Sequence, residues 1–160
     1  MFKLGMKLAA GALLVALTAG CTTQAGTVTD VHTGVSAKHS AGYSAHAGLL
    51  DNMNVVAAVG THAGVTKYGL SVNYSSTGLG WAFFREAWSF GKRLPYNVTQ
   101  EQVAGCGGGC TMVENGSIEL SKSEFEAAAK SGLEFKLVGK NRSVVGKVPA
   151  KAFAEALAQK

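Results

Sequence analysis

The chain has 160 residues, of which 16% are charged and 21 are glycine. A length of this order suits one domain better than two, and low charge with abundant glycine favours strands and turns over long solvated helices. The formal net charge is +5, with basic residues scattered among acidic ones. This excludes the clustered basic face that nucleic-acid binding requires, although a mildly basic surface is compatible with anionic lipid or wall polymer.

The N-terminal segment has the three parts of a secretory signal peptide. Lys3 and Lys7 give a basic start, residues 8–17 are almost entirely apolar, and small residues then lead to Cys21. The apolar run is shorter than the roughly 20 residues that cross a bilayer. Ending in Ala-Gly-Cys, the segment resembles the lipobox of bacterial lipoproteins, except that Thr18 stands where the family most often has Leu. The resemblance implies cleavage after residue 20 and acylation of Cys21.

The resemblance to bacterial lipoproteins also implies a location. Acyl chains such as palmitate on Cys21 would anchor the chain in a membrane, with residues 21–26 as a flexible tether and residues 27–160 as a single β-rich domain. Residue 22 is Thr, not the Asp that resembles an inner-membrane retention signal. In a bacterium with two membranes, we therefore expect the protein on the outer membrane, facing the periplasm. The body resembles small β-rich envelope lipoproteins, many of which lack a known activity.

The first part of the domain is rich in Thr, Ser, Gly and Ala. Residues 27–35 contain enough Thr and Val for a first strand, and residues 36–47 are expected to form a loop. His32, His39 and His46 lie seven residues apart, a spacing that on a helix would align them as metal ligands. The surrounding Gly and Ser oppose a helix, and no acidic or Cys partner is close in sequence. Coincidence is the favoured interpretation, and no metal is expected.

The middle of the chain predicts a series of short strands. Residues 67–74 show the clearest alternation, with Tyr68, Leu70, Val72 and Tyr74 on one face, as in a half-buried strand. Further strands are expected over residues 49–59, 80–84, 86–90, 94–99 and 111–120, the last with Ile118 and Leu120 pointing inward.

Residues 81–90 concentrate the aromatic side chains of the chain. They are Trp81, Phe83, Phe84, Trp88 and Phe90. A domain poor in Leu and Ile needs them for its core, because each aromatic side chain buries about 150–250 Å². The alternative is a groove for a glycan, peptide or other small ligand, formed by Trp81 and Trp88 with Arg85 and Arg93.

Cys106 and Cys110 are separated by three glycines. With Cys21 acylated, they form an even pair in an oxidising compartment, where disulfides persist, and the glycines allow the tight bend that a bond between them requires. A structural disulfide is the favoured interpretation. A redox pair is the first alternative, although such enzymes generally use Cys-x-x-Cys beside a helix. A zinc site would need two further ligands.

The last third of the chain combines two helices with a hairpin. Residues 121–124 match a capping box, Phe125, Ala128 and Ala129 provide an apolar face, and Gly132 is placed to end the helix. Residues 133–138 and 143–148 predict a hairpin with Leu133, Phe135 and Leu137 on one side. Pro149 can open a final helix, in which Ala150, Phe153, Ala154 and Leu157 follow helical spacing.

About eight strands and two short helices predict a mainly β fold, either an antiparallel β-sandwich or a partly open barrel. The sequence lacks a Gly-x-Ser-x-Gly elbow, a His-Glu-x-x-His motif and a phosphate-binding glycine loop. We therefore expect no catalytic residues and no cofactor. The first hypothesis is a non-enzymatic structural or interaction module for an envelope protein or cell-wall polymer. A periplasmic inhibitor or glycan-binding protein using residues 81–90, and an enzyme using the cysteine pair, are the alternatives.

Overall fold

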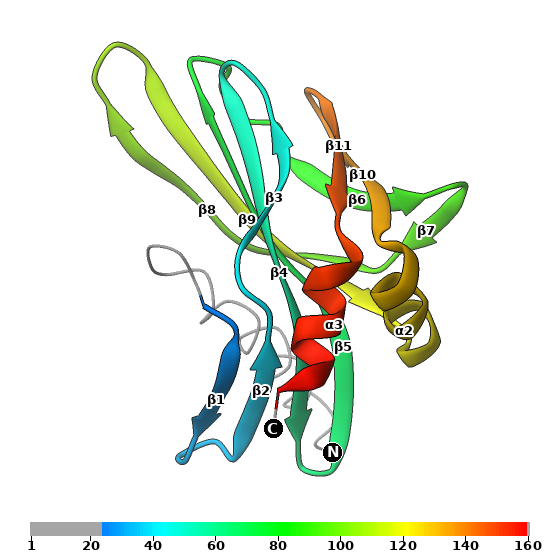
Figure 1. Cartoon of the computed structure of the whole chain (residues 1–160). Coiled ribbons are helices and arrows are strands. Elements are labelled where there is room, and N and C mark those ends of the chain that lie inside the picture. The colour runs from blue at the N-terminus through cyan, green and yellow to red at the C-terminus, as the bar shows by residue number, and fades with distance from the viewer. Residues whose placement is uncertain (1–23, 160) are drawn as a thin grey trace, which may run out of the picture.

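The computed structural model describes residues 24–159, so the signal peptide and Cys21 lie outside the described residues. The described residues form two antiparallel sheets and two helices (Figure 1). The larger sheet contains β1 (Gly26–Asp30), β2 (Val35–His39), β3 (Tyr43–Ala47), β4 (Asp51–His62), β5 (Val65–Thr77), β8 (Tyr96–Cys106) and β9 (Cys110–Leu120). The smaller sheet contains β6 (Phe84–Ser89), β7 (Lys92–Leu94), β10 (Leu133–Gly139) and β11 (Ser143–Val148). The helices are α2 (Lys122–Ser131) and α3 (Ala150–Ala158).

The larger sheet has the order β1-β2-β4-β5-β9-β8, with β3 also paired to β4, and the smaller sheet has the order β11-β10-β6-β7. The two sheets are separate and each keeps its own edge strands. They pack against each other through one hydrophobic core. The prediction of a mainly β fold with two helices is confirmed, and the arrangement is that of a sandwich.

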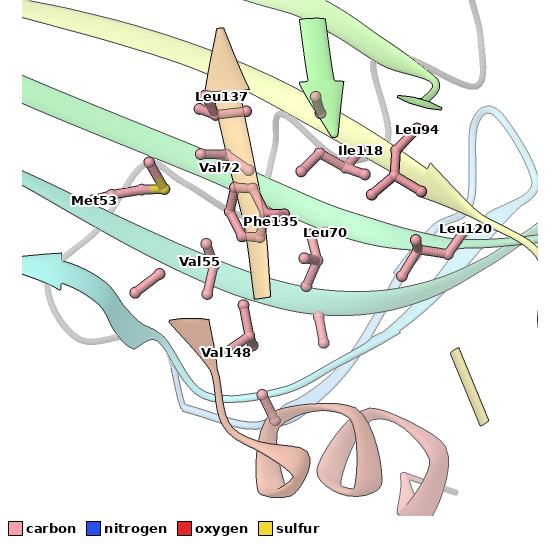
Figure 2. Close-up of a cluster of buried hydrophobic side chains, with 14 of the residues drawn as sticks. Met53, Val55, Leu70, Val72, Leu94, Ile118, Leu120, Phe135, Leu137 and Val148 are labelled. Carbon is pink, nitrogen blue, oxygen red and sulfur yellow. The ribbon is translucent and has the colours of Figure 1, made fainter. Parts of the chain in front are cut away.

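The core forms where the smaller sheet covers the larger one. Leu70, Val72 and Tyr74 of β5 are buried, as their alternation predicts. Figure 2 shows Phe135 and Leu137 of β10 packed over this face of the larger sheet. At Gly146 on β11, a Cβ atom would lie 2.8 Å from the ring of its cross-strand partner Phe135 and 3.1 Å from the sulfur of Met53 in the larger sheet. The glycine at position 146 therefore leaves room for the Phe135 ring in the core.

The two helices cover the other end of the same face (Figure 1). The predicted capping box is present: the Ser121 hydroxyl accepts from the Glu124 amide at 3.2 Å, and the Glu124 carboxylate accepts from the Ser121 amide at 2.8 Å. Phe125 of α2 packs edge-on against Phe153 of α3 at 5.0 Å between ring centroids. Gly132 follows α2 with a φ of 78°, as its place in the sequence predicts.

The prediction of one strand over residues 27–35 and a loop over 36–47 was wrong. The chain turns at residues 31–34, where Asp30 accepts from the His32 amide at 2.9 Å, and continues as β2 and β3. Both strands pair with β4. The hydrogen bonds of β4 thus override the weak strand preference of this Gly- and Ser-rich sequence, and residues 24–159 contain eleven strands instead of eight.

Two further predictions need correction. Residues 80–83 do not form a strand, and the adjoining strand is β6, which starts at Phe84. Helix α3 buries Ala152, Phe153 and Ala156, whereas the predicted face included Ala154 and Leu157, which are exposed. Contact between Phe153 and Phe125 of α2 sets the buried face. Within residues 24–159, no helix is both long and apolar enough to cross a bilayer.

The capping box predicts a pH dependence of stability. A hydrogen bond from Lys92, together with those from Ser121, lowers the pKa of Glu124 from 4.5 to about 2. A carboxyl group whose pKa is lower in the folded state stabilises the fold above its unfolded-state pKa and loses this effect as the pH falls toward 2. Glu124→Gln should therefore lower the free energy of unfolding at pH 7 and flatten its decline between about pH 4.5 and 2, measured by urea denaturation. Glu126→Gln on the same helix is the control, and parallel profiles for Glu124→Gln and the unsubstituted chain would contradict the prediction.

Candidate interaction site

Residues 80–83 carry the chain from the larger sheet to the smaller one, and a buried carboxylate holds them. Glu114 of β9 points into the space between the sheets and is only 2% exposed. One of its oxygens accepts from the Ala82 amide at 2.7 Å, and the other accepts from the Phe84 amide at 3.2 Å. Both carboxylate oxygens therefore have partners, as a buried charge requires.

Phe83 lies between these two amides and has a φ of 55°, in the left-handed region. For a bulky residue this conformation is an outlier that costs about 1–3 kcal/mol and must be held by its surroundings. The Glu114 carboxylate provides this support on both sides of Phe83. Since Ala82 and Phe84 are both buried in the core, the unusual backbone leaves the half-buried Phe83 ring outside it.

Three side chains form a stacked group, here called the aromatic cluster: Trp81, Phe83 and Arg85. The Trp81 and Phe83 rings stack with centroids 5.8 Å apart and an angle of 22° between their planes. The Arg85 guanidinium lies 5.7 Å from the centroid of Phe83, within the range of a cation–π contact. Arg85 also donates to Glu101 of β8 at 2.6 Å, and this hydrogen bond is the main reason that the pKa of Arg85 is raised. The aromatic cluster is thereby attached to β8.

The structure places the four side chains of the predicted groove in two separate groups. Trp81 and Arg85 belong to the aromatic cluster. Trp88 and Arg93 are cross-strand partners in the smaller sheet, and both contact Glu86, through a 2.8 Å hydrogen bond from the Trp88 indole and a 3.4 Å ion pair with Arg93. The favoured interpretation, that the aromatic residues build the core, holds for Phe84 but not for Phe90, which is 88% exposed at a turn.

Among the strands of residues 24–159, β8 forms one edge of the larger sheet and pairs only with β9. Its eleven residues are nearly all exposed, including Val98 and Val103. The edge strands β1, β7 and β11 are much shorter, with five, three and six residues. In Figure 1, β8 and β9 project beyond the smaller sheet. The outer edge of β8 therefore presents a long row of backbone donors and acceptors without a neighbouring strand.

The tip of this hairpin is closed by a disulfide between Cys106 and Cys110, as predicted. Gly108 and Gly109, with φ of 84° and 133°, make the bend. The cysteines lie at the end of a strand ladder and not at a helix terminus. This location is that of a staple between strands, and it differs from the setting in which Cys-x-x-Cys redox pairs operate.

The three histidines of the seven-residue repeat have different surroundings. His32 lies in the turn between β1 and β2, and His39 is buried in β2. The expectation that no acidic partner is close was wrong for His46, which pairs with Asp51 at 3.2 Å. In the part of the chain that the structure describes, no three His, Cys, Asp or Glu residues are grouped so that they could hold a metal ion.

Sequence reasoning missed two residues of this site, Glu101 and Glu114, and did not show that Phe83 contacts both Trp81 and Arg85. A signal for Glu114 was present, because the inward positions of β9, counted back from Leu120 and Ile118 in steps of two, include residue 114. An acidic residue at an inward position of an apolar strand needs buried partners. Nothing in the local sequence indicates the left-handed backbone at Phe83.

Comparisons of this chain with protein-family models, with curated proteins and with solved structures find no match. The function proposed below is therefore based on the residues of this chain alone. The features that support the proposed function are the free edge of β8 and the aromatic cluster beside it.

Replacing Glu114 should loosen the aromatic cluster. Glu114→Ala leaves two buried amide donors unpaired, at about 1–3 kcal/mol each, so the free energy of unfolding should fall by several kcal/mol. The Trp81 fluorescence should change with it, because Trp81 is next to Ala82, whose amide donates to Glu114. Glu119→Ala on the same strand removes only an exposed ion pair with Lys67 and should cost less than about 1 kcal/mol. Equal losses in the two variants, measured by urea denaturation, would show that Glu114 has no such role.

Proposed function

We propose that this chain is a lipid-anchored envelope protein that acts as a non-enzymatic interaction module. Its body binds an extended segment of a partner protein along the free edge of β8. The observation that supports this proposal is the length of this edge, eleven residues, next to the aromatic cluster. The anchor is Cys21, and the location is the outer membrane, facing the periplasm.

The chemistry of a strand edge selects a polypeptide as the partner. Donors and acceptors alternate along β8 at the spacing of a strand, and another extended backbone supplies the matching groups. Alternate side chains of an added strand would fall on the side of the sheet where Val98, Val103 and Arg85 lie. A partner segment with apolar residues at every second position fits this side.

Several features of β8 restrict which segments can pair. Register shifts lie between Val98 and Gln100 and between Val103 and Gly105. Glu101 carries a charge toward the side of Arg85 and pairs with it. Bulges and inward charges are devices by which natural edges avoid indiscriminate pairing. These features interrupt regular pairing on both sides of the central section of the eleven-residue edge, so a partner segment must match the interruptions as well, which favours a specific partner.

A second copy of this chain is a poorer occupant. Antiparallel pairing of two β8 strands over their full length would be centred close to Glu101, because this residue is the midpoint of Tyr96–Cys106. The two Glu101 carboxylates would then lie opposite each other, and like charges directly across a sheet are destabilising.

Glycan binding is the second candidate function. The half-buried indoles of Trp81 and Trp88 each keep part of their surface accessible, and Trp88 is the cross-strand partner of Arg93. However, Trp81 and Arg85 both lie against Phe83, so little of the Phe83 ring is free to stack on a sugar. A change in tryptophan fluorescence on addition of cell-wall glycan fragments would favour this function over polypeptide binding.

The anchor is tested by Cys21→Ser. This substitution removes the sulfur that would carry the acyl chains, so the protein should leave the membrane fraction. Fractionation followed by immunoblotting measures this change, and Cys106→Ser serves as the control because it removes a cysteine of the body and should not affect membrane association. Tight membrane association of Cys21→Ser would contradict a lipid anchor at this residue.

Binding at β8 is tested with a photo-reactive amino acid at Gln102, in the central section of the edge. It should give one discrete cross-linked product in the envelope, and mass spectrometry should place the attached peptide in an extended segment of another protein. Val103→Lys introduces an inward charge at the edge and should abolish the product.

The matched control is Val145 on β11, which is similarly exposed but lies in the smaller sheet. The photo-reactive residue at position 145 should give no such product, and Val145→Lys should not affect cross-linking from position 102. Cross-linking that survives Val103→Lys, or that occurs equally from positions 102 and 145, would contradict partner binding at β8.

A further inference from the structure

Three turns meet at the end of the molecule from which β8 and β9 project (Figure 1). They comprise residues 47–50, 77–80 and 104–111, and are called here the distal end. The Thr77 amide donates to the Leu50 carbonyl at 2.8 Å, and the Gly78 amide donates to the Cys110 carbonyl at 3.1 Å. The turns between β3 and β4, after β5, and between β8 and β9 are therefore side by side.

The distal end is apolar and uncharged. Leu49 is 98% exposed, Leu50 is 48% exposed and Leu79 is 39% exposed. The three segments contain no Asp, Glu, Lys, Arg or His. Asp51 follows directly, but its carboxylate accepts from Tyr74 at 2.8 Å and pairs with His46, so its charge is engaged by groups of the body. Exposed leucines gathered in this way indicate an interaction surface.

Besides Asp51, two basic residues of the turn between β10 and β11 lie near the distal end. The turn between β10 and β11 contains Lys140, which is exposed, and Arg142, which donates to the carbonyls of Leu79 and Gly80. An apolar end bordered by basic residues matches a membrane surface, where apolar side chains enter the acyl region and basic groups meet anionic lipid.

We propose that the distal end contacts a lipid bilayer, with Leu49, Leu50 and Leu79 inserted at the boundary between headgroups and acyl chains. The three leucine side chains lie on turns at one end of the molecule and are exposed, which suits insertion into a lipid bilayer. The disulfide holds one of the three turns in a fixed shape. This inference rests on the proposed membrane location and adds an orientation of the body, because an anchor at Cys21 alone leaves the orientation free.

Tryptophan quenching by brominated lipid tests this contact. Leu49→Trp is introduced into the full chain, purified in its membrane-anchored form, and placed in vesicles of phosphatidylethanolamine and phosphatidylglycerol brominated at the upper part of the acyl chain. Val31→Trp and Phe90→Trp are the controls, because these residues are 82% and 88% exposed at other turns. After subtraction of the signal from Trp81 and Trp88 in the unsubstituted chain, quenching at position 49 should exceed both controls by at least about twofold.

A second variant keeps the test independent of any effect of the new tryptophan on packing. Leu50→Asn combined with Leu79→Asn should reduce the quenching of Leu49→Trp to the level of the controls. Flotation of the vesicles is measured in parallel. A chain that does not float contradicts both the anchor and the contact, whereas a chain that floats without excess quenching at position 49 overturns the contact alone. The bilayer contact is also overturned if the tryptophan at position 49 is shielded from aqueous iodide in whole envelopes but is not quenched by brominated lipid in vesicles. That result would indicate that a protein partner covers the distal end.

Discussion

The fold depends on the difference in strand length between its two sheets. Strands β4, β5, β8 and β9 have 12, 13, 11 and 11 residues, whereas the strands of the smaller sheet have three to seven. At about 3.3 Å per residue, the long strands extend well beyond the short ones. The smaller sheet and the two helices cover the central part of the larger sheet, and long strands project beyond this cover at both ends: the β4–β5 hairpin at one end and the β8–β9 hairpin at the other (Figure 1). The exposed tip of the β8–β9 hairpin follows from this projection, and the free edge of β8 follows from its last place in the strand order.

Glu114 lies where the covered part of the larger sheet gives way to the projecting part. Across the sheet, its neighbours in register are Tyr74 in the core and Glu101 on the edge strand. An apolar residue at this position could pack in the core but could not accept the amides of Ala82 and Phe84, and the left-handed backbone at Phe83 would lose its support. The buried carboxylate is therefore the group that joins the core to the aromatic cluster. Burial raises the pKa of the adjacent Tyr96, and the charge of Glu114 adds to this rise.

Local sequence patterns predicted the elements whose structure is determined by residues close together in the sequence. The alternation of residues 67–74, the hairpin of residues 133–148 and the capping box at Ser121 each determine their structure within a few residues, and all three are confirmed. Strands β2 and β3 could not be predicted in this way, since their small residues become strands only by pairing with β4. The site was harder still, because Glu114 lies 30 residues or more from the amides it holds. Trp81 and Arg85 were identified from composition alone, which could not show that both side chains contact the ring of Phe83.

The edge of β8 and the distal end are physically continuous, because β8 ends in the disulfide that belongs to the distal end. A rigid tip is required if contact with a bilayer is to determine the direction of the strand behind it. The closed loop of Cys106 and Cys110, and the hydrogen bond from Gly78 to Cys110, connect the tip to β5 as well as to β9. In the proposed arrangement, β8 therefore starts in the body near Tyr96 and runs toward the membrane. A segment added along it would lie between the bilayer and the body, so the anchor, the tip and the edge would act together to fix where a partner is held.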